Sequence, residues 1–256
     1  GVRIRRPGAD PAGAAPDGAR PQDPGPALRR NGLAYRPPGD AALLAVVLRD
    51  APGLAPGEVA QHDLPLTVAV DPDAPGAAER AASYRAAGLE VILAGVGLPA
   101  GATPRDAEVT LAARLARFPA VIGVMDRADG GFAGDRALAE QIAGILAQEG
   151  HGLLLWDEGL NSAREVAAGA GAATALVWRR VDGPEMSAPA VGRRLDRAAF
   201  EARRTGALVV MAEARPETLE ALAAFAVEAR SERVALAPAS AVLLRQAPGP
   251  GGTAAR

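Results

Sequence analysis

Short apolar runs alternate along the chain with longer stretches of helical periodicity. From residue 42 onward the apolar runs are 42–48, 64–70, 89–95, 120–125, 152–156, 174–178, 207–212 and 233–237. The space between successive runs leaves room for one helix, as crossovers between parallel strands require. Within the runs apolar positions are continuous, which is typical of strands in a sheet that is buried on both faces.

The repeating unit is clearest near residue 207, where an apolar strand is followed by Glu213, a turn and an amphipathic helix. Pro216 suits the first turn of that helix, because its missing N–H has no partner there. Thr103, Pro104 and Asp106 mark another helix start, with Thr as N-cap and an acidic residue at the third helical position. These signals place strand, loop and helix in a regular order.

Seven or eight strand-helix units in a row predict an α/β fold, a distorted (β/α) barrel with seven or eight parallel strands. A doubly wound open sheet is the alternative that the same units allow. The 256 residues, of which 49% are hydrophobic, are sufficient for the core of one large domain. We expect this domain to cover residues 39–246.

The two flanking segments lack apolar periodicity. Residues 1–38 are dense in Pro, Gly, Ala and Arg and cannot bury enough surface to offset the entropy of ordering, so we expect a disordered linker. Residues 247–256 are expected to be a flexible tail. No apolar run approaches the ~20 residues of a membrane helix. Because residue 1 is Gly, the linker could tether the domain to a segment upstream.

Composition excludes several kinds of chemistry. The chain has no Cys, and all 28 of its basic residues are Arg, so thiolate metal sites, cysteine nucleophiles and lysine Schiff bases are ruled out. A net charge of −2 gives no reason to expect a nucleic-acid partner. Aromatic residues make up only 3% of the chain, so surfaces for stacking on sugars are scarce, which favours a protein partner over a sugar.

Charged residues follow almost every predicted strand. In a parallel α/β fold the C-terminal ends of the strands converge on one rim, where functional groups lie. The rim is expected to hold Asp50, Asp71, Asp73, Asp126, Arg127, Asp129, Asp157, Glu158, Arg179, Arg180, Asp182, Glu213 and Arg215. Two interpretations are open: these residues start loops and neutralise one another, or they bind a divalent cation or a hydroxyl-rich ligand.

Neither the histidines nor the glycine-rich segments indicate a site. His62 and His151 each precede an apolar run, so both are expected at the opposite end of the barrel, and a metal site shared between them is not expected. The segments 95–101 and 129–135 are rich in Gly but lack the spacing of a phosphate-binding or dinucleotide-binding loop.

Several phrases together resemble the divergent polysaccharide deacetylase family, a branch of the NodB-like carbohydrate deacetylases. They come in the family's order and cover about residues 42–244. The phrases are LPLTVAVDPDAPG, AAGLEVILA, RFPAVIGVMDRADGGFAGD, GLLLWDEGLNS, ARPETLEAL and RVALAPASAVL. The resemblance implies a distorted (β/α) barrel and a metal-dependent hydrolase that removes acyl groups from N-acetylated sugars. In such an enzyme an Asp pair and histidines hold the metal and move protons.

The resemblance places the family's Asp pair in the segment LRDAPGL. Without a gap, Asp50 takes the first place and Ala51 the second; with a gap of one residue, Arg49 and Asp50 do. One of the two carboxylates is absent in either register.

The family's histidines fall on other residue types. The histidine after the third strand falls at Ala94, that of the NNHMGS-like segment at Arg127, and that of the GHPRPETL-like segment at Glu213. Asp157 matches the Asp of the LDS-like segment. Arginine stays protonated, so it repels a metal ion instead of binding one.

We therefore expect a catalytically inactive member of the family, a module of the periplasm or cell envelope that binds a glycan or an envelope protein. The vestigial catalytic positions are Asp50, Asp157 and Glu213, no metal is expected, and the expected ligand-binding residues are Asp50, Asp126, Arg127, Asp157, Glu213 and Arg215. The alternative is an active hydrolase whose carboxylates Asp50, Asp126, Asp157 and Glu213 hold Mg²⁺ or Ca²⁺. A third possibility is a domain that supports oligomerisation, with the rim as an internal ion-pair network.

Overall fold

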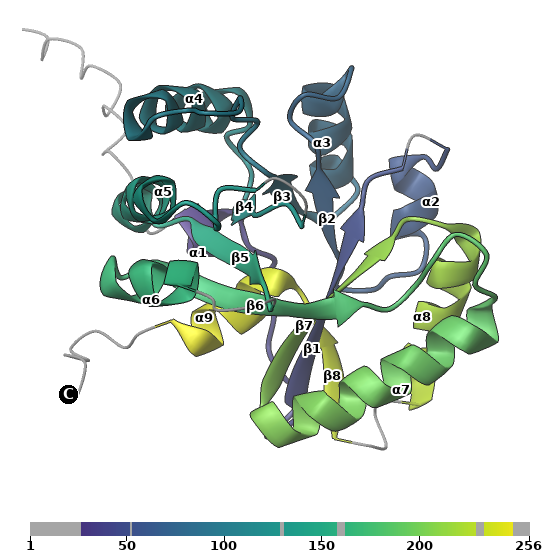
Figure 1. Cartoon of the computed structure of the whole chain (residues 1–256). Helices are drawn as coiled ribbons and strands as arrows, with labels where there is room; N and C mark the ends of the chain where they lie inside the picture. The colour runs from purple at the N-terminus through teal and green to yellow at the C-terminus, as the bar shows by residue number, and fades with distance from the viewer. Residues whose placement is uncertain (1–26, 52, 129–130, 158–161, 229–232, 248–256) are drawn as a thin grey trace, which may run out of the picture.

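Strands and helices alternate along residues 27–51, 53–128, 131–157, 162–228 and 233–247, which this computed structural model describes (Figure 1). Each of the eight predicted strands is present. Their bounds are β1 Ala42–Arg49, β2 Thr67–Val70, β3 Glu90–Ala94, β4 Gly123–Met125, β5 Gly152–Trp156, β6 Ala173–Arg180, β7 Ala207–Glu213 and β8 Val234–Ala237.

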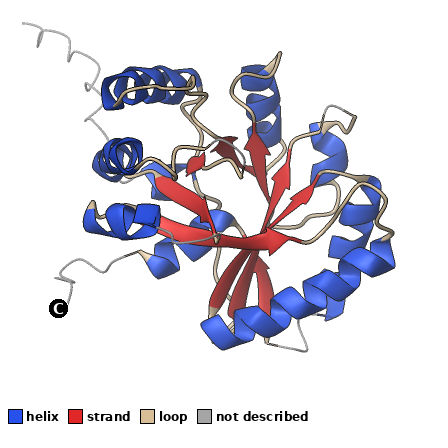
Figure 2. Cartoon of the chain, in the orientation of Figure 1, coloured by secondary structure: helices blue, strands red, loops and turns tan. Residues whose placement is uncertain are grey.

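The helices lie between and around these strands (Figure 2). Their bounds are α1 Ala27–Asn31, α2 Pro56–Ala60, α3 Ala77–Ala86, α4 Pro104–Arg117, α5 Arg136–Glu149, α6 Ser162–Gly169, α7 Ala188–Thr205, α8 Pro216–Glu228 and α9 Ala239–Gln246. The predicted start of α4 is confirmed, because the Thr103 side chain accepts from the N–H of Asp106 and the Asp106 carboxylate accepts from the N–H of Thr103.

The strands form a closed parallel barrel. β1 to β7 pair in sequence order, and β1 closes the ring by pairing with both β7 and β2. One edge of β1 is shared: its first residues, from Ala42 to Ala45, pair with β8, and its last, from Val47 to Arg49, pair with β2. The barrel prediction is confirmed, and the open doubly wound alternative is wrong.

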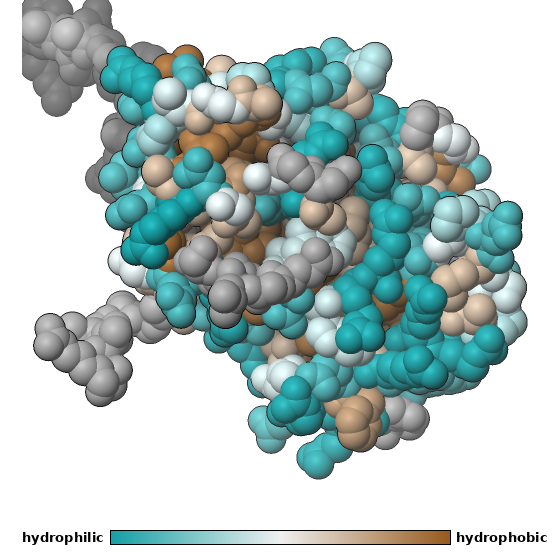
Figure 3. Space-filling model, in the orientation of Figure 1, coloured by the Kyte–Doolittle hydropathy of each residue, from teal (hydrophilic) through white to brown (hydrophobic). Residues whose placement is uncertain are grey.

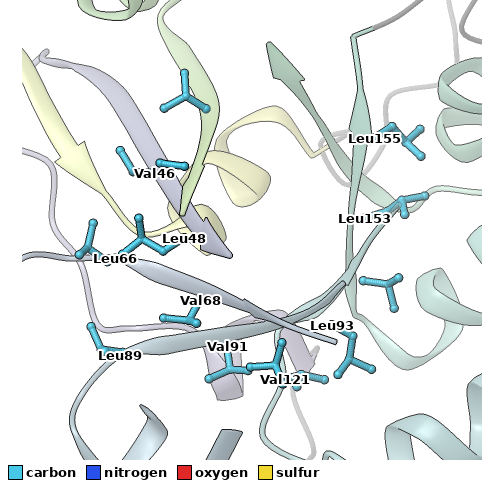
Figure 4. Packing of buried hydrophobic residues seen from close by; sticks show 14 of the residues in the cluster. Val46, Leu48, Leu66, Val68, Leu89, Val91, Leu93, Val121, Leu153 and Leu155 are labelled. Atoms are coloured by element: carbon cyan, nitrogen blue, oxygen red, sulfur yellow. The ribbon is translucent and has the colours of Figure 1, made fainter. Parts of the chain in front are cut away.

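Both faces of the barrel wall are buried, which explains the continuous apolar runs. In β1, Leu44, Val46 and Leu48 pack outward under the helices, whereas Leu43 and Val47 pack into the barrel. Figure 4 shows the outward cluster continuing along neighbouring strands through Val68, Val91, Leu93, Leu153 and Leu155.

The end of the barrel where the strands begin is closed by α1 and α9. Leu28 of α1 and Leu243 of α9 belong to the interior cluster, and both lie against the start of β5 at Gly152. A Cβ atom at Gly152 would lie 2.6 Å from Leu243 Cδ1, so a larger residue there would displace the Leu243 side chain. In the described part of the chain, the open end of the barrel is the opposite one, at the C-terminal ends of the strands, where ligands bind in such folds.

A buried carboxylate fixes this closed end. Glu90, at the start of β3, is fully buried; its Oε1 accepts from the Thr67 hydroxyl at 2.8 Å and from the N–H of Ser240 at 3.0 Å. Its Oε2 accepts from the N–H of Leu33 at 3.2 Å. Thr67 Oγ1 in turn accepts from the N–H of Ala239, so one network joins two strands, α9 and the segment after α1.

The segment from residue 27 corrects the predicted linker boundary. Residues 27–31 form α1, with Ala27, Leu28 and Asn31 buried, because Leu28 covers the barrel interior and the Asn31 amide donates to the carbonyl of Val121 at 2.7 Å. The rest of the expected linker that precedes α1, residues 1–26, and most of the expected tail, residues 248–256, lie outside the described residues. Within the described part of the chain, no helix combines the length and apolar character needed to cross a membrane.

Candidate functional site

A cavity of about 910 Å³ opens at the C-terminal ends of the barrel strands; we call it the mouth cavity. Its wall comes from the ends of β1 to β7 and from the loops that follow them. Figure 3 shows a hollow near the middle of the face in view, with apolar atoms in its depth and hydrophilic atoms around it. Among the described residues, its polar and aromatic lining is Arg49, Asp50, Asp71, Arg80, Asp126, Arg127, Trp156, Trp178, Arg179 and Arg180.

Three of these arginines come from strands spread around the barrel. Arg49 ends β1, Arg127 follows β4, and Arg179 lies near the end of β6. All three are exposed, and the side chains of Arg49 and Arg127 make no hydrogen bond or ion pair with any other described residue. The Arg179 guanidinium lies over the ring of Trp178, 4.0 Å from its centroid. The cavity thus contains guanidinium groups that a ligand can reach.

Asp50 is held by two residues of α3. Arg80 forms an ion pair with Asp50 through both carboxylate oxygens, with Nε donating to Oδ2 at 2.8 Å. The Tyr84 hydroxyl donates to Oδ1 at 2.7 Å. Burial by itself raises the pKa of Asp50, but the hydrogen bonds from Arg80 and Tyr84 outweigh it, so the pKa is lowered. The pKa of Tyr84 is raised, by burial and by its hydrogen bond to Asp50.

Asp126 is buried and organises the loop after β4. Its Oδ1 accepts from the N–H of Phe132 at 3.0 Å and its Oδ2 from the N–H of Ala133 at 3.1 Å. Gly131 lets the loop come this close, because a Cβ atom there would lie 2.3 Å from Asp126 Oδ1. Burial raises the pKa of Asp126, and the backbone hydrogen bonds offset only part of this shift.

Gly95, directly after β3, leaves the space in which the Arg127 side chain packs. Gly95 has a φ of +86°, and its N–H donates to the carbonyl of Met125 at 2.7 Å. A Cβ atom at this position would lie 2.9 Å from Arg127 Cγ. The Arg127 stem therefore packs over a position that only glycine occupies without strain.

The two tryptophans of the chain both line the mouth cavity. Trp156 ends β5 and Trp178 lies near the end of β6, and both are half-buried. The Trp156 indole donates to the carbonyl of Asp126 at 3.0 Å, which joins its ring to the loop after β4. Large aromatic surface is thus concentrated at the mouth cavity.

Glu213 and Arg215 lie beside the cavity in an ion-pair network. Glu213 Oε1 is 3.3 Å from Arg180 Nη2, and Arg215 Nη2 is 3.8 Å from Asp182 Oδ2. Asp182 is buried, and its Oδ2 also accepts from the N–H of Glu213 and from the Thr218 hydroxyl. Of the predicted ligand-binding residues, Asp50, Asp126 and Arg127 line the mouth cavity, whereas Glu213, Arg215 and Asp157 do not.

A second cavity, of about 480 Å³, adjoins the first; we call it the side cavity. Its wall is the loop 95–102 together with residues between Asp126 and Leu138. Asp126 and Arg127 line both cavities, so the open space continues from the barrel mouth across the loop that Asp126 organises.

The remaining predictions for the rim have mixed outcomes. Asp71 lines the mouth cavity, and Asp73 forms an ion pair with Arg114. His151 is buried before β5, at the closed end of the barrel, as predicted, and burial lowers its pKa. Asp129 and Glu158 lie outside the described residues. Across the described parts of the chain, no three His, Cys, Asp or Glu side chains are grouped so that they could hold a metal ion.

A closed parallel barrel with its cavity at the strand ends defines an α/β barrel protein of the NodB-like kind. The sequence profile of the divergent polysaccharide deacetylases matches residues 55–243, about three quarters of the chain. The chain belongs to this family. The match begins after Arg49 and Asp50.

Solved structures share the fold at low sequence identity. An uncharacterized protein from Agrobacterium tumefaciens C58 is 21% identical, with a TM-score of 0.67 over 84% of this chain and 94% of that one. A proposed cellobiose-phosphate cleavage protein from Enterococcus faecalis V583 is 12% identical, with a TM-score of 0.60 over 79% and 99%. A proposed polysaccharide deacetylase from Mycobacterium smegmatis is 14% identical, with a TM-score of 0.53 over 84% and 93%. No curated protein matches the chain.

Sequence reasoning missed the aromatic and helical parts of the site. The signal for the tryptophans was present, since Trp156 and Trp178 each end an apolar run, at the rim where ligands bind. Arg80 and Tyr84 gave no such signal. They lie four residues apart on α3, and their partner Asp50 is at least 30 residues away in sequence.

Proposed function

We propose that this member of the divergent polysaccharide deacetylase family binds a glycan at the barrel mouth without hydrolysing it. The observation that carries this proposal is the placement of both tryptophans of the chain in the mouth cavity, beside exposed arginines. A volume of about 910 Å³ lies within the range of ligand sites, about 300–1,000 Å³. The low aromatic content gave a mild argument for a protein partner, and the concentration of tryptophan at one site outweighs it.

The chemistry of the lining suits a sugar. An indole ring offers a flat apolar face for the C–H groups of a pyranose ring. Arginine and carboxylate groups donate to and accept from the hydroxyl groups around the ring. The side cavity gives room for a further residue of an extended chain, since it shares Arg127 with the mouth cavity. A glycan therefore fits the site better than a compact ligand.

The metal that the family uses does not fit the side chains present. Both oxygens of Asp50 accept from Arg80, and the two oxygens of Asp126 accept from the backbone N–H groups of Phe132 and Ala133. Arg127 brings a permanent positive charge to the place of a histidine ligand. These contacts support an inactive protein and disfavour a carboxylate site rebuilt from Asp50, Asp126, Asp157 and Glu213.

Membership of a carbohydrate deacetylase family supports action outside the cytoplasm. We place the protein in the periplasm or cell envelope, where its ligand would be an envelope glycan. An envelope protein that docks on the same rim is the alternative partner. The expected tether lies in residues 1–26, outside the described part of the chain.

Tryptophan fluorescence of the full chain tests the proposal directly, because both fluorophores line the cavity. We expect triacetylchitotriose or trigalacturonate to cause a saturable change in emission. Trp156→Ala should weaken binding about tenfold, as expected for loss of one aromatic contact. The matched control is Phe200→Ala, an exposed aromatic residue on α7 that should leave the affinity unchanged. If neither saccharide binds, and N-acetylglucosamine 6-phosphate does not bind either, the glycan proposal is wrong.

A further inference from the structure

The charge on the lining of the mouth cavity is unequal. Among the described residues, five arginines and three aspartates line it: Arg49, Arg80, Arg127, Arg179, Arg180, Asp50, Asp71 and Asp126. Within this set, more of the carboxylates than of the guanidinium groups already have partners within the protein. A ligand that enters the cavity therefore meets mainly positive charge.

Two of the three aspartates are used inside the protein. The Asp50 carboxylate accepts hydrogen bonds from Arg80 and Tyr84, and both oxygens of Asp126 accept from backbone N–H groups of the loop after β4. Asp71 Oδ1 accepts from the N–H of Asp73 at 2.9 Å. A cation entering the cavity would therefore have to displace existing hydrogen bonds.

The arginines are used unequally. Arg80 pairs with Asp50, and Arg180 lies 3.3 Å from Glu213 at the edge of the cavity. The side chains of Arg49 and Arg127 make no hydrogen bond or ion pair with another described residue. Arg179 lines the cavity and stacks on Trp178, and its charge, after that of Arg204, also lowers the pKa of Glu201 on α7. Guanidinium groups bind carboxylate and phosphate groups through two parallel hydrogen bonds, and a low-dielectric wall strengthens such contacts.

We infer that the mouth cavity selects an acidic saccharide, one that carries a carboxylate or a phosphate group, and that Arg49, Arg127 and Arg179 bind this group. The inference rests on the proposed glycan-binding function and adds the class of ligand. The tryptophan rings contact the sugar ring, and the arginines bind its charged group. Arg127 contributes most, because it lies on both cavities and its stem is fixed over Gly95.

The test compares neutral and acidic probes on the full chain by isothermal titration calorimetry. The probes are triacetylchitotriose as the neutral saccharide, trigalacturonate as the carboxylate, N-acetylglucosamine 6-phosphate as the sugar phosphate, and inorganic phosphate alone. We expect one of the two acidic saccharides to bind at least about tenfold more tightly than triacetylchitotriose, as loss or gain of one charged hydrogen bond implies. This preference should shrink as salt is added, because ions screen the attraction.

Substitutions of single arginines test which side chains produce the preference for the acidic probe. Arg127→Gln keeps the apolar stem over Gly95 and should remove about tenfold of the affinity for the acidic probe while changing that for the neutral probe less than about twofold. Arg49→Gln should act in the same direction, and Arg127→Lys should keep part of the preference because it keeps the charge. The control is Arg245→Gln, an exposed arginine of α9 at the closed end of the barrel, which should change neither affinity. A thermal melt of each variant shows that it folds.

The outcomes separate the two proposals. Equal affinity for neutral and acidic saccharides, unchanged in Arg127→Gln, would overturn this inference and leave the glycan-binding function in place. Binding of inorganic phosphate without any saccharide, or no binding of any probe, would overturn both. A preference for trigalacturonate shows that the arginines bind a carboxylate, and a preference for the sugar phosphate shows that they bind a phosphate group.

Discussion

At the scale of single residues, the mouth cavity is lined by guanidinium groups and by carboxylates that already accept hydrogen bonds from the protein. Arg127 lies where the family resemblance places a histidine, and its packing over Gly95 shows that the surrounding backbone suits the larger side chain. Ala94, at another such place, leaves open volume in the wall of the same cavity. The lining thus combines permanent positive charge with free space, which favours an anionic ligand.

The ion pair of Asp50 gives a prediction about pH. The pKa of Asp50 is lowered in the folded protein, so its contribution to stability is present above the ordinary aspartate pKa and is lost as pH falls through that value toward the folded one. Asp50→Asn should therefore reduce the free energy of unfolding by about 2 kcal/mol near neutral pH. The difference from the native chain should shrink at about pH 3, in urea titrations at both pH values.

Asp196→Asn serves as the control for this experiment, because Asp196 is exposed on α7. It should leave the unfolding free energy nearly unchanged at both pH values. A destabilisation by Asp50→Asn that is as large in acid as at neutral pH would show that the carboxylate charge is not what Arg80 and Tyr84 recognise.

Strand ends were a partial guide to the residues of the cavity, since Asp157 and Glu213 also lie at strand ends but do not line it. Asp50, Asp126 and Arg127 were placed at the rim and do line the cavity. Their partners could not be predicted, because Arg80 comes from a helix whose orientation depends on the packed barrel. The role of Asp126 in the loop was equally hidden, since it depends on backbone N–H groups six and seven residues further along.

At the scale of elements, the apolar runs were sufficient to predict all eight strands, because a strand buried on both faces has few polar positions. The short helix α1 was missed. Its five residues, ALRRN, have no periodicity that a sequence pattern can show, and Leu28 is buried only because the barrel leaves its lower end open. A single apolar side chain after a Pro-rich segment gives no local signal of such a role.

The closed end gives a prediction about stability. Glu90→Ala should lower the free energy of unfolding by about 3 kcal/mol, because the Thr67 hydroxyl and the N–H groups of Leu33 and Ser240 would lose their buried acceptor. Glu90→Gln keeps one carbonyl oxygen and should cost less. Urea unfolding monitored by circular dichroism measures both values.

Glu140→Ala is the comparison for the Glu90 variants, since Glu140 is exposed on α5. It should change the unfolding free energy by less than about 0.5 kcal/mol. If Glu90→Ala falls within the same limit, the network does not hold α9 and the segment after α1 on the barrel.

At the scale of the whole molecule, closure of the barrel separates stability from function. Packing on both faces of the wall and the plug formed by α1 and α9 hold the strands, so the opposite end is free to vary its side chains. The mouth cavity lies at that end and collects both tryptophans and the exposed arginines. The same scaffold could therefore carry a metal-dependent hydrolase or a binding protein, and the lining decides between them.

The most direct test of this account is a titration of the full chain with Zn²⁺, Mg²⁺ and Ca²⁺, followed by an assay of acetate release from triacetylchitotriose at saturating metal. The account predicts no stoichiometric binding of any of the three ions and no release of acetate above the buffer rate. Tight binding of one ion per chain that is lost in Asp50→Ala, together with release of acetate, would contradict it.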